Sequence, residues 1–159
     1  MPGPKVERLE DGELGLVRPL LADLHLDEQV HFPEHPQLSR QQALNSVREI
    51  ASRFDGQNVI FAIRDGAGGI AAFCWCVLFD PGTGLEGEVA ELYVAPEHRA
   101  AGNARALLEA ATDLFRERRV TLAYVWTREE NRAAVRLYEG AGFRATRQLV
   151  LTWYPSGRG

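Results

Sequence analysis

Residues 91–108, with the sequence ELYVAPEHRAAGNARALL, combine a short apolar run, a proline stop and small residues that open a helical pattern. The first turn of a helix has main-chain N–H groups without intrahelical partners and carries the positive end of the helix dipole. Such a helix start binds anions, pyrophosphate among them. Gly102 allows a ligand to approach the backbone closely, and Arg99 adds positive charge. This segment therefore predicts an anion site that needs no lysine.

A second segment, residues 131–143, reads NRAAVRLYEGAGF. Asn131 can cap a helix, and Tyr138 follows it by about two helical turns. Both side chains then lie on one face of the helix, where they can contact the same extended ligand. A tyrosine at neutral pH carries a proton, so Tyr138 is suited to donate it to a leaving group.

Together the two segments resemble the GNAT superfamily of acyl-CoA-dependent N-acetyltransferases. In that family a strand is followed by [QR]-x-x-G-x-[GA] and a helix, and Arg99, Gly102 and Ala104 occupy the fixed positions. Glycine is commoner than alanine at the last of them. The residues that match the second family pattern, N-x-x-A-x-x-L-Y-x-x-x-G-F, are Asn131, Ala134, Leu137, Tyr138, Gly142 and Phe143. The resemblance covers residues 58–154 and is weaker before them.

The resemblance implies an α/β fold of the α+β type, with a mixed, mostly antiparallel sheet of about six strands and helices on both faces. It also implies transfer of an acetyl group from acetyl-CoA to a primary amine of a small molecule or peptide, directly within a ternary complex. The pantetheine arm would enter between two splayed strands, residues 88–95 and 121–127. The expected cofactor-binding residues are Leu92, Tyr93, Val94, Arg99, Ala100, Ala101, Gly102, Asn103, Ala104, Asn131 and Tyr138.

An amine acceptor is mostly protonated at neutral pH, because its free pKa is about 10, so a base must remove a proton before attack. Glu88 and Glu91 are the candidate carboxylates. Being three positions apart on a strand, they are expected to point to opposite faces. The choice of base among Glu88, Glu91, a loop histidine and water stays open. The oxyanion would be held by the main-chain N–H of Val94 or Tyr93.

Residues 27–38, DEQVHFPEHPQL, are interpreted as a loop because they contain two prolines and two histidines. In the family the corresponding loop helps to shape the acceptor site, so His31, Phe32 and His35 are candidates for contacting the substrate. Because no cysteine pair accompanies these histidines, no metal site is expected. The glycines of residues 82–87, GTGLEG, lie between two strands and predict a turn rather than a dinucleotide site.

The elements that must position these candidate site residues are expected in the order β-α-α-β-β-β-α-β-α-β along the chain. The periodicity predicts an edge strand over 5–10, a helix from Asp11 bent at Pro19, and a second helix from the Ser39 capping box to Phe54. Apolar runs then predict strands over 59–64, 70–79, 88–95 and 121–126. Helices are expected over 102–118 and 131–139, and a closing strand over 143–154.

A chain of 159 residues, 45% of them hydrophobic, suits one domain, residues 1–159. The net charge of −4 makes nucleic acid an unexpected partner, and no apolar run reaches the length of a membrane span. A cytoplasmic protein is expected, with Cys74 and Cys76 buried in a strand. A non-catalytic CoA-binding module on the same fold is the alternative function. The acyl chain length, the identity of the amine and homodimer formation stay open.

Overall fold

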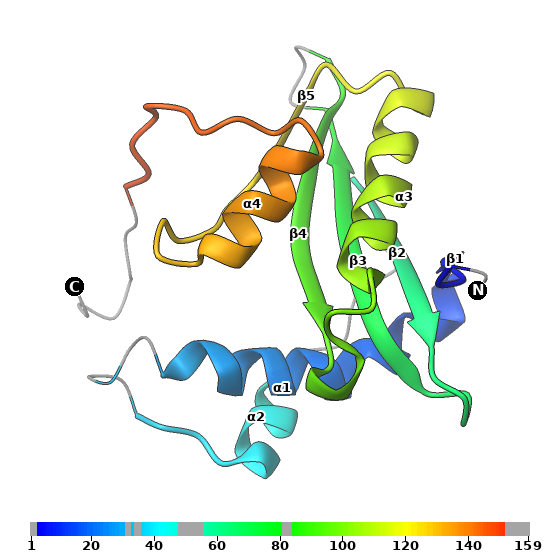
Figure 1. Cartoon of the computed structure of the whole chain (residues 1–159), viewed down its shortest axis with the longest axis vertical. Helices are drawn as coiled ribbons and strands as arrows, with labels where there is room; N and C mark the ends of the chain where they lie inside the picture. The colour runs from blue at the N-terminus through cyan, green and yellow to red at the C-terminus, as the bar shows by residue number, and fades with distance from the viewer. Residues whose placement is uncertain (1–2, 31–32, 34–35, 48–55, 81–83, 152–159) are drawn as a thin grey trace.

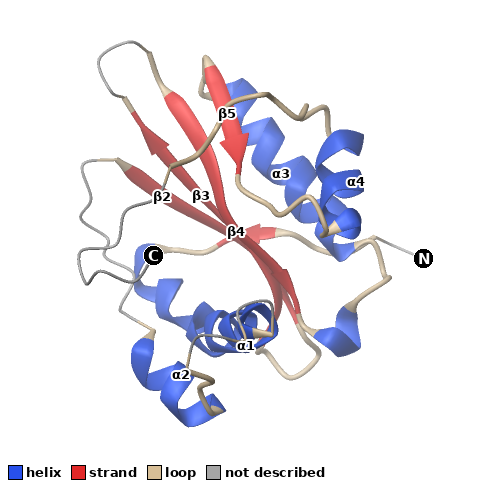
Figure 2. Ribbon diagram, turned by 90° about the vertical axis from the view of Figure 1, so that its left-hand side faces the viewer, coloured by secondary structure: helices blue, strands red, loops and turns tan. Residues whose placement is uncertain are grey.

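The computed structural model describes residues 3–30, 33, 36–47, 56–80 and 84–151 as three layers, with a twisted sheet between two pairs of helices (Figures 1 and 2). The five strands are β1 (Glu7–Arg8), β2 (Gln57–Arg64), β3 (Ile70–Phe79), β4 (Glu86–Val94) and β5 (Leu122–Val125). They are neighbours in chain order. Strands β1 to β4 pair antiparallel, and β5 pairs parallel to β4. The parallel pair follows from the crossover helix that connects its strands.

One face of the sheet is covered by the N-terminal helices. A 3-10 helix, η1 (Asp11–Val17), leads into α1 (Arg18–Gln29), and α2 (Arg40–Ser46) packs against α1. Pro19 lies in the first turn of α1, where its missing N–H has no cost, so the predicted kink is replaced by a change from 3-10 to α geometry. The predicted capping box is present, with Ser39 and Gln42 bonding each other's backbone N–H groups.

The other face of the sheet is covered by α3 (Asn103–Glu117) and α4 (Arg132–Gly140) (Figure 2). One apolar side of α3 packs on the sheet and belongs to the same buried cluster as Val89, Val94 and Tyr138. Tyr93 faces the opposite way, into the cluster beneath α1 and α2. Strand β4 therefore presents side chains to both helical layers.

A β-bulge interrupts β4 in its middle. Glu91 pairs with Trp75 of β3 and Val89 pairs with Cys76, so Ala90 has no partner of its own. A bulge adds one residue to a strand and reverses the alternation of side chains beyond it. The register between β4 and β5 also ends at Val89, so the two strands separate from the bulge onward. The predicted parting of these strands is thus present, and the bulge marks where it begins.

The structure also departs from the sequence-based expectation at the end of α1, at the end of α2 and near the C-terminus. Helix α2 ends at Ser46, and Val47 is already extended, where the helix was expected to continue. Helix α1 continues to Gln29, so Asp27 and Glu28 are helical rather than part of a loop. Residues 144–151 form no strand, and the apolar Leu149 and Leu151 are exposed. Apolar β-formers make a strand only where a neighbouring strand offers hydrogen bonds, and this segment pairs with none of the described strands. The sheet consequently has five described strands rather than about six.

Candidate functional site

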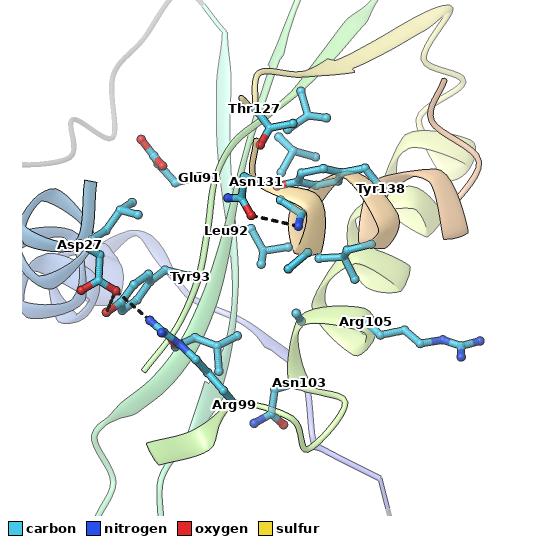
Figure 3. A pocket seen from close by; sticks show the side chains of 18 of the residues that line it. Asp27, Glu91, Leu92, Tyr93, Arg99, Asn103, Arg105, Thr127, Asn131 and Tyr138 are labelled. Atoms are coloured by element: carbon cyan, nitrogen blue, oxygen red, sulfur yellow. Dashed lines mark hydrogen bonds and ion pairs between the residues drawn. The ribbon is translucent and has the colours of Figure 1, made fainter. Parts of the chain in front are cut away.

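The site is a cleft of about 1190 Å³ that runs from the start of α3, through the gap between β4 and β5, to one side of α4 and the end of α1 (Figure 3). A volume above the range typical of drug-sized ligands suits an extended ligand. Of the residues expected to bind cofactor or to act in catalysis, the cleft is lined by Glu91, Leu92, Tyr93, Val94, Arg99, Ala100, Gly102, Asn103, Ala104, Asn131 and Tyr138. Ala101 and Glu88 do not line it.

The start of α3 is shaped by an unusual backbone. Ala100 and Gly102 both have positive φ, 62° and 80°, and the chain turns through them into the helix. The Asn103 side chain is buried and donates to the carbonyl of His98 at 2.8 Å, so it stabilises the turn and is not free for a ligand. The main-chain N–H groups at this helix start have no intrahelical acceptors, so they form an anion cradle beside the cleft.

The open edge of β4 supplies further main-chain groups. The N–H of Ala95 donates to Ala71 of β3 at 2.9 Å, so the main-chain groups of Ala95 and Tyr93 point toward β3. Since successive residues alternate in direction, those of Leu92 and Val94 point into the gap. Of the two expected oxyanion donors, Val94 is therefore the one whose N–H faces the cleft. The carbonyl of Val94 accepts from Arg99 Nε at 2.9 Å.

The two candidate bases lie on the same face of the sheet, and the prediction that they face opposite ways is wrong. The bulge at Ala90 reverses the alternation between them. Burial, with smaller contributions from the charges of Glu28 and Glu88, raises the pKa of Glu91 to about 7. The pKa of Glu88 is also raised by burial, and a hydrogen bond from the Trp126 side chain offsets only part of this increase. Glu91 alone of the pair lines the cleft, so it is the better placed base.

Tyr138 and Asn131 meet on the cleft side of α4, as their spacing predicts. The Asn131 side chain caps the helix by accepting from the N–H of Ala134 at 3.2 Å. The Tyr138 ring packs edge-on against Phe143, with centroids 5.9 Å apart. Burial raises the pKa of Tyr138, and the nearby Cys74 and Glu91 raise it further. The phenol therefore stays protonated throughout the neutral range.

Arg99 is bound to the protein rather than directed at the helix start. Its Nη2 lies 2.8 Å from Oδ2 of Asp27 in α1, and the Tyr93 hydroxyl donates to the same oxygen at 3.1 Å (Figure 3). The guanidinium also lies over the Tyr93 ring, 5.5 Å from its centroid. Three groups from α1 and β4 thus fix the position of this side chain.

The lining residues that the sequence analysis did not single out include Asp27, Glu28, Trp126 and Arg128. Arg128 Nη2 pairs with Glu28 Oε2 at 2.9 Å, and Trp126 is 60% exposed. The ion pair joins residues about 100 positions apart in the chain, so no local sequence pattern predicts it. The only available signal was the adjacent Asp27-Glu28 pair beside the loop histidines.

Three of the residues predicted for the site are not among those that the structure describes. The candidate substrate residues His31, Phe32 and His35 lie outside the described residues. Cys74 and Cys76 are fully buried in β3, as predicted, and the hydrogen bond with the Cys76 thiol, together with burial, raises the pKa of Cys74. Such a thiol is a poor nucleophile. Among the described residues, no three His, Cys, Asp or Glu side chains form a metal-binding group, and no helix is long and apolar enough to cross a membrane.

This architecture and cleft agree with the family comparison. The model of the acetyltransferase (GNAT) family matches residues 20–143, and the chain belongs to that family. Among curated proteins, the mycothiol acetyltransferase of Stackebrandtia nassauensis is 35% identical over 117 residues, which are 70% of this chain and 37% of that protein. The mycothiol acetyltransferase of Thermobifida fusca is 36% identical over 121 residues, 70% of this chain and 36% of that protein. The chain therefore spans little more than a third of these relatives.

A solved structure of the same fold covers nearly the whole chain. A ribosomal-protein-alanine N-acetyltransferase from Brucella melitensis biovar Abortus 2308 aligns with a TM-score of 0.65 and 20% identity, over 94% of this chain and 99% of that one. At this identity the likeness establishes the fold, which includes the three layers.

Proposed function

We propose that the chain is an N-acetyltransferase that moves an acetyl group from acetyl-CoA directly to a primary amine in a ternary complex. The observation that carries this proposal is the continuous cleft, which connects the anion cradle of α3 with Glu91 and Tyr138 through the gap between β4 and β5. The family's use of acetyl-CoA supports the choice of donor.

Acetyl-CoA fits this cleft in one direction. Its pyrophosphate would accept from main-chain N–H groups of residues 100–104, where the dipole of a fifteen-residue helix favours negative charge. The pantetheine arm would pair with the main chain of Leu92, as an added strand pairs with a sheet edge. The carbonyl of Val94 already accepts from Arg99, and the N–H of Val94 is assigned to the oxyanion of the transfer step.

The acceptor amine would approach from the α1 face of the sheet. The cofactor elements α3 and α4 lie on the opposite face, whereas Asp27, Glu28 and Glu91 line the cleft on the α1 side. Glu91 faces this side and has a pKa of about 7, which is suited to taking a proton from an ammonium group near neutral pH.

The transfer itself needs three groups. Glu91 removes a proton from the amine, whose nitrogen then attacks the thioester carbonyl, and the Val94 N–H stabilises the oxyanion that forms. When the tetrahedral intermediate collapses, the C–S bond breaks and the thiolate takes the proton of Tyr138. The nitrogen releases its second proton as the amide forms, and this proton returns to Tyr138 through solvent. No protein nucleophile is acylated, in agreement with the burial of both cysteines.

An amine panel tests this proposal. The purified chain is mixed with acetyl-CoA and each amine, and released CoA is measured as free thiol; the panel includes amino acids, peptides, aminoglycosides, polyamines and the acceptor used by the mycothiol acetyltransferases. Thiol release that depends on one class of amine is the expected result. Tight acetyl-CoA binding without release for any amine would instead indicate a CoA-binding module, and no binding would refute the assignment.

A further inference from the structure

The end of α1 carries two adjacent carboxylates, and each is paired with an arginine from a different loop of the cleft. Asp27 pairs with Arg99, which precedes α3, at 2.8 Å. Glu28 pairs with Arg128, which precedes α4, at 2.9 Å. The two loops belong to the cofactor side of the cleft and α1 to the other, so both ion pairs cross between the layers.

The geometry of Arg99 explains why its role differs from that of a phosphate ligand. Its Nε is committed to the Val94 carbonyl and its Nη2 to Asp27, and the plane of the guanidinium lies over the Tyr93 ring. Figure 3 shows the side chain extending from the loop toward α1, away from the start of α3. The Tyr93 hydroxyl completes the arrangement by donating to Asp27. All these contacts define where α1 ends relative to β4.

The second ion pair connects α1 to the segment that follows β5. Arg128 follows β5 where that strand has separated from β4, and its pairing with Glu28 connects α1 to the far border of the gap. Glu28 is also close enough to Glu91 to affect that carboxyl. The end of α1 is thus held at two points, by Arg99 from the loop after β4 and by Arg128 from the segment after β5.

We propose that Arg99 and Arg128 are positioning residues that hold the end of α1 against the cleft and thereby determine how well the acceptor amine binds, while acetyl-CoA is bound without their guanidinium groups. The role in acceptor binding rests on the proposed function. The anchoring of α1 is independent of it. Removal of either arginine should therefore change the KM for the amine and leave the affinity for acetyl-CoA unchanged.

The test uses Asp27→Asn, Arg99→Gln and Arg128→Gln, which remove one charge each and keep a polar side chain. Asp23→Asn is the matched control, because Asp23 also forms an exposed ion pair from α1, with Arg40 of α2 at 2.9 Å, and does not line the cleft. Ion pairs this exposed make modest contributions, so each test variant should raise the KM for the amine about three- to fivefold. The kcat, and the Kd for acetyl-CoA by calorimetry, should change less than about twofold.

Two further measurements separate anchoring from ligand contact. The double variant Asp27→Asn/Arg99→Gln should raise KM no more than the larger single effect, because both changes break one contact. Hydrogen exchange of the amides of residues 24–29 should be about three- to fivefold faster in all three variants, but not in Asp23→Asn. A large loss of acetyl-CoA affinity in Arg99→Gln but not in Asp27→Asn would overturn the proposal, and so would unchanged exchange. If the chain has no acyltransferase activity, the exchange result still decides whether α1 is anchored.

Discussion

Replacing Glu91 by glutamine removes the proposed base and keeps the size of the side chain. An amine with a pKa of about 10 is deprotonated only to about one part in a thousand at pH 7, so the reaction depends on a group that takes the proton. General bases contribute about 100- to 10,000-fold. We expect kcat to fall at least about 100-fold, with the acetyl-CoA Kd unchanged, as measured by thiol release and calorimetry.

The pH dependence provides a second readout. Burial raises the pKa of Glu91 from its ordinary 4.5 to about 7, so wild-type kcat/KM should fall below about pH 7 as the carboxylate becomes protonated. This acidic limb should be missing from Glu91→Gln. The raised pKa also means that the native state keeps a proton that the unfolded chain loses near pH 4.5. Stability attributable to Glu91 therefore decreases as pH rises from about 4.5 to 7.

The size of that stability effect follows from the two pKa values. A difference from 4.5 to about 7 corresponds to an upper limit of about 3 kcal/mol, so Glu91→Gln should be more stable than wild type at pH 8 and less different from it at pH 5. Urea unfolding at both pH values measures this difference in stability.

Glu88→Gln is the control for the kinetic prediction, because Glu88 lies on the same face and does not line the cleft. The kcat of this variant should change less than about threefold. Equal losses in both variants, or a retained acidic limb in Glu91→Gln, would refute the assignment of the base.

Three other substitutions test the remaining parts of the cleft. Tyr138→Phe keeps the packing on Phe143 and removes the hydroxyl, so kcat should fall about 10- to 100-fold at constant acetyl-CoA affinity. An unchanged kcat, measured by stopped-flow thiol release, would exclude Tyr138 as the acid. Asn131→Ala removes the cap of α4 and should cost about 1 kcal/mol of stability in urea unfolding, and a variant as stable as wild type would contradict the capping role. Cys74→Ala should retain activity, and intact-mass spectrometry of wild type with acetyl-CoA should detect no acetylated protein; a cysteine-dependent adduct would contradict direct transfer.

The sequence could place the segments that are expected to bind the cofactor, because each of them is short. The anion cradle occupies one turn between β4 and α3, and Asn131 and Tyr138 lie on one short helix. Local periodicity and capping chemistry are sufficient to place such residues. The order of elements was also predictable, apart from the closing strand, since each helix and strand has its own apolar pattern.

The acceptor side could not be predicted in the same way. The bulge at Ala90 depends on the register of β4 against β3, and a register is a property of two strands rather than of one sequence segment. The bulge places Glu88 and Glu91 on the same face of the sheet, whereas strict alternation of side chains predicts opposite faces. The pairing of Arg99 with Asp27 joins residues 72 positions apart, so nothing near Arg99 in the chain distinguishes an α1 anchor from a phosphate ligand.

The central claim, that acetyl-CoA binds with its pyrophosphate at the start of α3, is tested most directly by calorimetry on substitutions of Ala104. This residue lines the cleft in the first turn of α3. The helix dipole favours a carboxylate in this first turn, but a carboxylate there repels a pyrophosphate. We predict one acetyl-CoA bound per chain by wild type and by Ala104→Gly, and at least tenfold weaker binding by Ala104→Glu, all measured at a temperature at which the three proteins are folded. Undiminished binding by Ala104→Glu, or no binding by wild type, would contradict the account.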